Sequence, residues 1–166
     1  MKIRIAGIVN DSIVDGPGFR LAVFTQGCPH HCPGCHNPDT HDFNGGKEDD
    51  TDRIVALMRE NPLLDGVTLT GGDPFCQSGP CAEIAEAAKK LGLNVWAYSG
   101  WTWEELSRTA ETDPDTARLL KSTDILVDGP FVLSQRTLEL RFRGSRNQRL
   151  INVPASLKEG RAVEAE

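Results

Sequence analysis

Residues 20–35 read RLAVFTQGCPHHCPGC, a short apolar run that leads directly into a loop with three cysteines. The run over residues 20–26 predicts a buried strand, because it is rich in apolar residues that favour β structure. Cys28, Cys32 and Cys35 follow with the spacing C-x3-C-x2-C. The sequence therefore predicts that three thiols gather on one tight loop at the carboxyl end of a strand.

The rest of the chain alternates between predicted strands and predicted helices. Further strands are expected at 67–70, 93–98 and 124–127, and helices at 51–60, about 80–91, after a capping box at 102–105, and at 113–121. This βα alternation is typical of a parallel sheet, in which the carboxyl ends of the strands form the active edge. The chain has 166 residues, fewer than the roughly 200 or more of a complete eight-fold barrel. The predicted fold class is therefore α/β, a partial (open) βα barrel with a mostly parallel sheet.

Three thiolates on one loop can hold three corners of an iron–sulfur cube and leave the fourth iron open to a ligand. Zinc is the alternative, because it accepts Cys3His sites and histidines lie nearby at positions 30, 31, 36 and 41. Structural zinc sites more often present two separated pairs of ligands, and the sequence has no second C-x2-C pair. The spacing favours iron–sulfur and leaves zinc open.

Composition and charge bound the class of protein. The net charge of −6 argues against nucleic acid as the main partner, and no apolar run approaches the ~20 residues that span a bilayer. The five cysteines are an odd number, and the first ten residues alternate like a strand instead of forming an export signal. We therefore expect reduced thiols and a cytoplasmic location. The arginines between Arg136 and Arg149 form either a contact surface for an anionic ligand or partner, or a solvated face.

A second candidate site is the tetrapeptide Gly71-Gly72-Asp73-Pro74, which follows the predicted strand at 67–70. Two glycines let the backbone approach a ligand closely, and Asp73 could accept a hydrogen bond from an ammonium group. The same four residues are also common in plain turns. The ligand interpretation gains support because the cysteine loop is expected at the same edge of the sheet.

Together these segments resemble known enzymes. The cysteine loop and the Gly-Gly-Asp-Pro strand end are similar to those of radical S-adenosylmethionine enzymes, and residues 14–20, VDGPGFR, resemble the activating enzymes of glycyl radical proteins. Three further segments resemble the activators of anaerobic ribonucleoside-triphosphate reductase, at 98–106, 125–131 and 143–149. The resemblance runs from about residue 13 to residue 151, nearly the whole chain.

The resemblance implies cofactors and the residues that hold them. Cys28, Cys32 and Cys35 would ligate a [4Fe–4S] cluster, whose open iron would bind the amino and carboxylate groups of S-adenosylmethionine. The residues implied to contact S-adenosylmethionine are Gly34, Cys35, His36, Gly71, Gly72 and Asp73. No catalytic side chain is implied, because the cofactors carry the chemistry.

The implied activity is that of an oxidoreductase. Reduced flavodoxin or a similar donor would supply an electron, S-adenosylmethionine would be cleaved reductively, and the 5′-deoxyadenosyl radical would generate a glycyl radical on the reductase. An activator of another glycyl radical enzyme, a radical enzyme acting on a metabolite, and a zinc or electron-transfer module are the alternatives. We expect one domain over residues 1–166, with a flexible tail over about 154–166.

Overall fold

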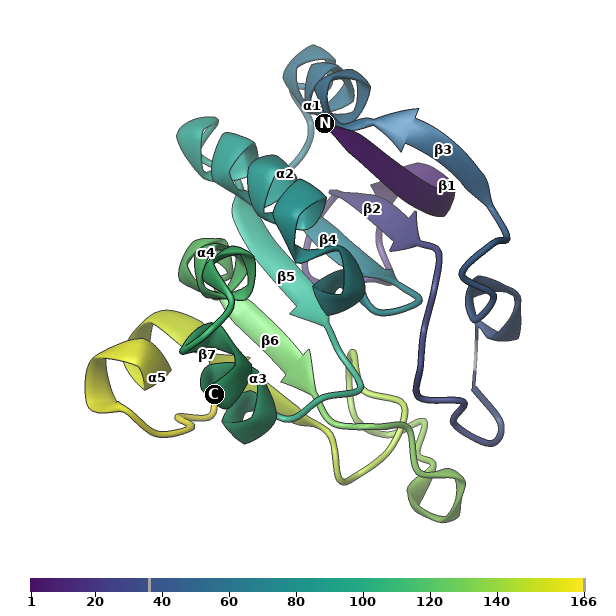
Figure 1. The fold of residues 1–166 in the computed structure, drawn as a ribbon, viewed down its shortest axis with the longest axis vertical. Helices are drawn as coiled ribbons and strands as arrows, with labels where there is room; N and C mark the ends of the chain where they lie inside the picture. Colours follow the sequence, from purple (N-terminus) through teal and green to yellow (C-terminus); the bar gives the residue numbers. More distant parts are fainter. Residues whose placement is uncertain (36, 166) are drawn as a thin grey trace.

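The computed structural model describes residues 1–35 and 37–165, and its framework is one seven-stranded sheet (Figure 1). The strand order is β3-β1-β2-β4-β5-β6-β7. The strands are β1 (Lys2–Ser12), β2 (Arg20–Thr25), β3 (Lys47–Asp50), β4 (Gly66–Gly71), β5 (Asn94–Tyr98), β6 (Ile125–Asp128) and β7 (Arg149–Asn152). The sheet does not close on itself, since β3 and β7 lie at its two edges.

The four central strands, β2, β4, β5 and β6, are all parallel. The outer strands pair antiparallel, β1 with β2 and with β3, and β7 with β6. Thr25 pairs with Gly71, so β2 and β4 end side by side. The prediction of an α/β fold with an open, partial βα barrel is confirmed, and its parallel part is the stretch that places the cysteine loop beside Gly71.

Helices cover one face of this sheet (Figure 1). They are α1 (Thr51–Glu60), α2 (Ser78–Lys90), α3 (Trp103–Ala110), α4 (Pro114–Ser122) and α5 (Val153–Glu159). Short 3-10 turns occur at η1 (Pro38–Thr40), η2 (Pro74–Gln77) and η3 (Leu133–Gln135). No helix in the described part of the chain is both long enough and apolar enough to cross a bilayer.

Local sequence explains where the helices begin. The Thr102 hydroxyl accepts a hydrogen bond from the Glu105 backbone N–H, and the Glu105 carboxylate accepts one from the Thr102 backbone N–H, which is the predicted capping box. Asp113 caps α4, whose first residue is Pro114, a position where proline loses no hydrogen bond. Asp50 caps α1 in the same way.

The two faces of the central strands differ in chemistry. Because side chains alternate along a strand, one set packs under the helices and the other faces away from them. The set in the core under the helices is apolar: Leu21, Val23, Val67, Leu69, Val95, Ala97 and Leu126. The alternate set on β2, β4 and β5 is mixed: Arg20, Ala22, Phe24, Thr68, Thr70, Trp96 and Tyr98. The second face forms the floor of the candidate site.

The carboxyl-terminal residues form regular structure. Helix α5 begins at Val153, which is buried, and the Asn152 N–H donates to the Val163 carbonyl at 2.8 Å. Glu164 makes an isolated bridge to Ile151. We propose that the chain is one domain, because a single sheet and a single core run through it; the flexibility of the tail stays a prediction.

Candidate cofactor site at the carboxyl edge of the sheet

A cavity of about 380 Å³ opens at the carboxyl ends of the parallel strands. Cys28, Cys32 and Cys35 line it, together with Gly71 and Gly72 from the end of β4. These two segments lie far apart in the sequence, and the parallel pairing of β2 with β4 brings them together. The structure therefore places both predicted site segments at one edge, as parallel α/β folds do with their ligand sites.

Backbone hydrogen bonds close the cysteine loop at its base. The Gly27 N–H donates to the Thr40 carbonyl at 2.7 Å, and the Cys28 N–H donates to the His41 carbonyl at 3.2 Å. The Gln26 side chain donates to two further carbonyls of the same loop, those of Asp39 and Asp42. The loop thus returns to its own starting point and presents the cysteines between these fixed ends.

The three cysteines differ in burial. Cys28 is buried, Cys32 and Cys35 are half-buried, and all three are free thiols. Burial raises the pKa of the Cys28 thiol to about 11. A thiolate therefore forms at Cys28 more readily when a bound cation compensates for the lost hydration.

The cysteines line one cavity without yet converging. Among the described residues, no three His, Cys, Asp or Glu side chains form a ready-made metal site. Ligands commonly converge only when the metal binds, because a preformed set of thiolates would repel itself. The chemistry of the donor set fits an iron–sulfur cluster, because three soft sulfur ligands border one cavity.

Gly71 and Gly72 lie in close contact with the backbone of the chain itself. A Cβ on Gly71, whose φ is +92°, would lie 2.6 Å from the Thr25 nitrogen, and one on Gly72 would overlap the Gly27 carbonyl oxygen. The Gly72 N–H also donates to the Thr25 carbonyl at 2.7 Å. The structure shows that these glycines admit the end of β2 and the start of the cysteine loop. Both also line the cavity, and their contact with a ligand stays a prediction.

Asp73 is fully engaged by protein donors. Its side chain is fully buried, and the residue is absent from the cavity lining. Oδ1 accepts from the Phe75 N–H at 3.0 Å; Oδ2 accepts from the Gly100 N–H at 3.0 Å and the Ser99 hydroxyl at 2.9 Å. Oδ2 also lies 2.6 Å from His30 Nε2. The carboxylate expected to accept from an ammonium group is thus already used within the chain.

The other predicted contacts are placed differently. Gly34 lies outside the cavity lining, and a Cβ there would lie 2.9 Å from Leu133 Cδ1. His36 lies outside the described residues. Cys76 and Cys81 do not line the cavity, and burial raises the pKa of both thiols, as expected for packed thiols away from a ligand.

Several cavity residues were not singled out individually by sequence reasoning, although the motifs that contain them were. Every segment that carried the family resemblance contributes to the lining: Val14 and Asp15, Tyr98, Ser99 and Gly100, Val127, Gly129 and Phe131, and Arg143, Gly144 and Gln148. Segments scattered over the whole sequence therefore meet at one site. Membership in such a motif was the signal that could have identified them.

Arg20 and Arg143 are two cations near the cavity without a carboxylate partner in the described ion pairs. Arg20 is fully buried, donates to the Thr68 hydroxyl at 2.7 Å and stacks on Trp96, and burial lowers its pKa to about 10. Arg143 lines the cavity, and its buried Nε has no hydrogen-bond partner. One cation thus supports the floor, while the other is part of the wall.

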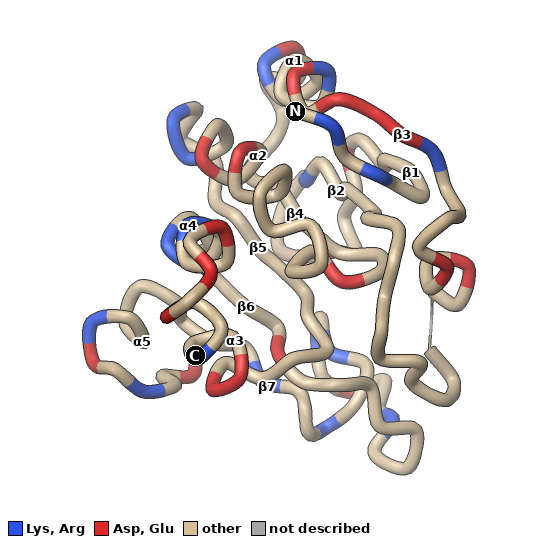
Figure 2. The backbone as a smooth tube through the Cα atoms, viewed as in Figure 1, with Lys and Arg blue, Asp and Glu red and all other residues tan. Residues whose placement is uncertain are grey.

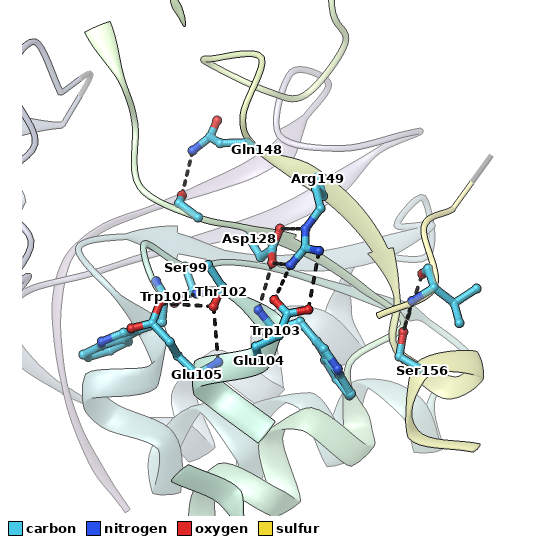
Figure 3. Close-up of polar contacts among 12 residues, drawn as sticks. Ser99, Trp101, Thr102, Trp103, Glu104, Glu105, Asp128, Gln148, Arg149 and Ser156 are labelled. Atoms are coloured by element: carbon cyan, nitrogen blue, oxygen red, sulfur yellow. Dashed lines mark hydrogen bonds and ion pairs between the residues drawn. The ribbon is translucent and has the colours of Figure 1, made fainter. Parts of the chain in front are cut away.

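The wall between β6 and β7 is anchored by Arg149 (Figure 3). Its guanidinium contacts the buried Asp128 at 2.5 and 3.1 Å and reaches Glu104 of α3 at 2.7 Å. Gln148 donates to the Gly129 carbonyl at 3.1 Å. The ion pair with Asp128 raises the pKa of Arg149 above its usual value. Arg149 therefore belongs to the framework, and the expected arginine surface is reduced to its other members.

The comparisons with known proteins identify the family. A family model described as a 4Fe-4S single cluster domain matches residues 14–151. The anaerobic ribonucleoside-triphosphate reductase-activating protein of Vibrio cholerae is 33% identical over 144 residues, 82% of this chain and 89% of that protein. Its counterpart in Escherichia coli K12 is 32% identical over 146 residues, 82% of this chain and 90% of that protein. The chain belongs to this activator family.

Two further comparisons give a partial match in sequence and a match in fold. The pyruvate formate-lyase-activating enzyme of Clostridium pasteurianum is 40% identical over 97 residues, 55% of this chain and 41% of that enzyme. The crystal structure of QueE from Escherichia coli shares the fold, with a TM-score of 0.50 at 17% identity over 61% of this chain and 54% of that one.

Membership in the activator family decides between the metals left open by the cysteine spacing. The family is built around a single [4Fe–4S] cluster, so the prediction of an iron–sulfur site is confirmed over zinc. The predictions of a radical S-adenosylmethionine enzyme and of a glycyl radical activator are confirmed with it.

Proposed function

We propose that this chain activates an anaerobic ribonucleoside-triphosphate reductase and that Cys28, Cys32 and Cys35 hold its cluster. The observation that carries the proposal is the shared cavity, which the three cysteines line together with residues from every family motif. When bound, the cluster and S-adenosylmethionine supply a 5′-deoxyadenosyl radical that removes a hydrogen atom from a glycine of the reductase. No side-chain acid or base is needed for this chemistry.

The residues of the chain bind and orient the two cofactors and shield the radical from solvent. The closed base of the cysteine loop fixes the position of Cys28, and Gly34, Cys35 and His36 are proposed to border S-adenosylmethionine. Gly71 and Gly72 are proposed to lie along its methionine end, since both line the cavity. Asp73 contributes indirectly, by holding the loop. The open face admits a segment of a large partner, which a closed barrel would exclude.

The electron donor and the compartment belong to the same proposal. Reduced flavodoxin or a similar one-electron donor fits a cluster that lies at an open edge of the sheet. All five cysteines are free, which suits the reducing cytoplasm. The net charge of −6 disfavours nucleic acid as the main partner.

The test uses the protein reconstituted with iron and sulfide without oxygen. Dithionite and S-adenosylmethionine are added and 5′-deoxyadenosine is measured, then the reductase is added and a glycyl radical is sought by electron paramagnetic resonance. We expect both signals. Cofactor cleavage with no radical on the reductase would contradict the assigned partner, and absence of cleavage at full cluster content would contradict the enzyme itself.

A second candidate partner is another glycyl radical enzyme of the pyruvate formate-lyase type. The 40% identity to the Clostridium pasteurianum activator favours it, although that match covers only 97 residues. Offering both glycyl radical enzymes to the same reconstituted protein separates the two, because the spectrum shows which of them acquires the radical.

A further inference from the structure

We propose that His30 and Asp73 form a clasp that positions the cysteine loop on the ends of β4 and β5, with His30 as a positioning residue for the cluster. The clasp deepens the proposed function, because it rests on the assignment of Cys28, Cys32 and Cys35 as ligands. His30 lies in the loop between the first two of these cysteines.

The contact between the two side chains is short and shielded. His30 Nε2 lies 2.6 Å from Asp73 Oδ2, and the side chains are 15% and 0% exposed. The Asp73 carboxylate only accepts, so the Nε2 nitrogen carries the proton in this contact. A Cβ on Gly100 would overlap the imidazole, and the Trp101 ring meets it edge-on at 4.6 Å. The imidazole is therefore closely packed between Gly100, Trp101 and Asp73.

Asp73 attaches the loop at two points. Its backbone N–H donates to the Gly27 carbonyl at 2.9 Å, at the start of the loop, and its side chain holds His30 further along. Cys28 lies between these attachments, and Cys32 lies two residues beyond the second. Fixing both points removes backbone freedom that the loop would otherwise lose when the cluster binds.

The other partners of Asp73 fix the clasp to the sheet. Ser99 and Gly100, which donate to its carboxylate, follow β5, while Asp73 itself follows β4. The carboxylate thus joins the cysteine loop to two parallel strand ends. This structural role explains why the Asp73 carboxylate is buried and has all its hydrogen-bond donors within the chain, although its motif suggests a contact with a ligand.

The test compares substitutions that differ in reach. His30→Gln keeps an N–H the same number of bonds from the backbone as the imidazole Nε2, whereas His30→Asn is too short to reach Asp73. His31→Asn is the matched control, because His31 is exposed and has φ +50°, a conformation that asparagine tolerates. The readout is the rate of iron loss from the reconstituted cluster to a chelator, with no reductase present.

We expect His30→Asn to lose iron about tenfold faster than the wild type, the scale typical for a group that orients a metal ligand. His30→Gln and His31→Asn should stay within about twofold of the wild type. Equal retention in all variants overturns the clasp. Fast iron loss in His31→Asn would show that any substitution in the loop weakens the cluster. Fast iron loss in His30→Gln would show that the N–H donated to Asp73 does not hold the cluster. Either result also overturns the clasp.

A measurement on the cluster-free chain separates this proposal from the proposed function. The Gly100 N–H shares the Asp73 Oδ2 acceptor with His30. Its hydrogen exchange should speed up about tenfold in His30→Asn but not in His30→Gln or His31→Asn, a loss of about 1.4 kcal/mol of protection. Unchanged exchange in His30→Asn overturns the clasp, even if the wild type takes up no cluster or activates no reductase.

Discussion

Gly72 lies where the end of β4 touches the start of the cysteine loop, and its missing side chain allows this contact. A Cβ there would overlap the carbonyl oxygen of Gly27, which is backbone and cannot rotate away. Gly72→Ala should therefore destabilise the fold by about 1–3 kcal/mol, the usual cost of overpacking. Urea unfolding measures this. Gly7→Ala is the matched control, since a Cβ at Gly7 meets nothing within 4 Å; equal losses in both variants would contradict the clash.

Substitutions should distinguish the cysteine that is proposed to bind the cluster from one that is not. Replacing Cys28 with serine removes one of the three thiolates that border the cavity, and the cluster should then be lost almost entirely. Cys76→Ser is the control, because Cys76 does not line the cavity. Iron and sulfide analysis after reconstitution compares the two variants. Full iron content in Cys28→Ser would rule out Cys28 as a ligand.

Sequence reasoning identified the reactive residues better than their partners. The spacing of Cys28, Cys32 and Cys35 predicts a metal site, because ligand spacing is a local property of the chain. Apart from the neighbouring Phe75, the partners of the Asp73 carboxylate are 26 to 43 residues away, and only the fold brings them together. The sequence could therefore suggest an ammonium contact for Asp73, which stays a prediction, but it could not reveal the protein donors that this carboxylate has in the fold.

Among the elements, strand β7 is held to β6 and to α3 by one guanidinium. Arg149 bridges the buried Asp128 and the exposed Glu104 (Figure 3). Arg149→Gln would leave the Asp128 carboxylate short of donors, so we expect a loss of about 1–3 kcal/mol in the free energy of unfolding. Glu104→Gln should cost less than about 1 kcal/mol, because that end of the bridge is solvated. Similar costs in urea unfolding would contradict this ranking.

The edge strands were the elements least visible in the sequence. The central strands are apolar on their core face and could be predicted from pattern alone. Strand β3 reads KEDD, a run that resembles a solvated acidic face, yet it pairs antiparallel with β1. An edge strand needs little burial, and charged side chains there prevent further pairing, so its sequence carries no strand signal.

At the scale of the molecule, the helices and the cavity lie on different sides. Helices α1 to α4 cover one face of the sheet, while the segment between β6 and β7 and the cysteine loop border the cavity. Figure 2 shows basic positions in that segment, all of them arginines, away from the acidic stretch of β3. We therefore expect a partner that must reach the cavity to approach over the segment between β6 and β7.

Leu133 of η3 tests this direction of approach. It is 50% exposed and lies against the cysteine loop at Gly34, a position from which it would contact a partner entering the cavity. Leu133→Glu should weaken binding of the reductase about fivefold or more, on the order of 1 kcal/mol, the binding energy typical of an interface residue that is not a hot spot.

Leu157→Glu on α5, where Leu157 is 46% exposed, is the control and should leave the affinity unchanged. Binding is measured by titration under anaerobic conditions, with iron content checked so that a damaged cluster is not mistaken for a lost contact. Equal affinities of the two variants would place the reductase on another face.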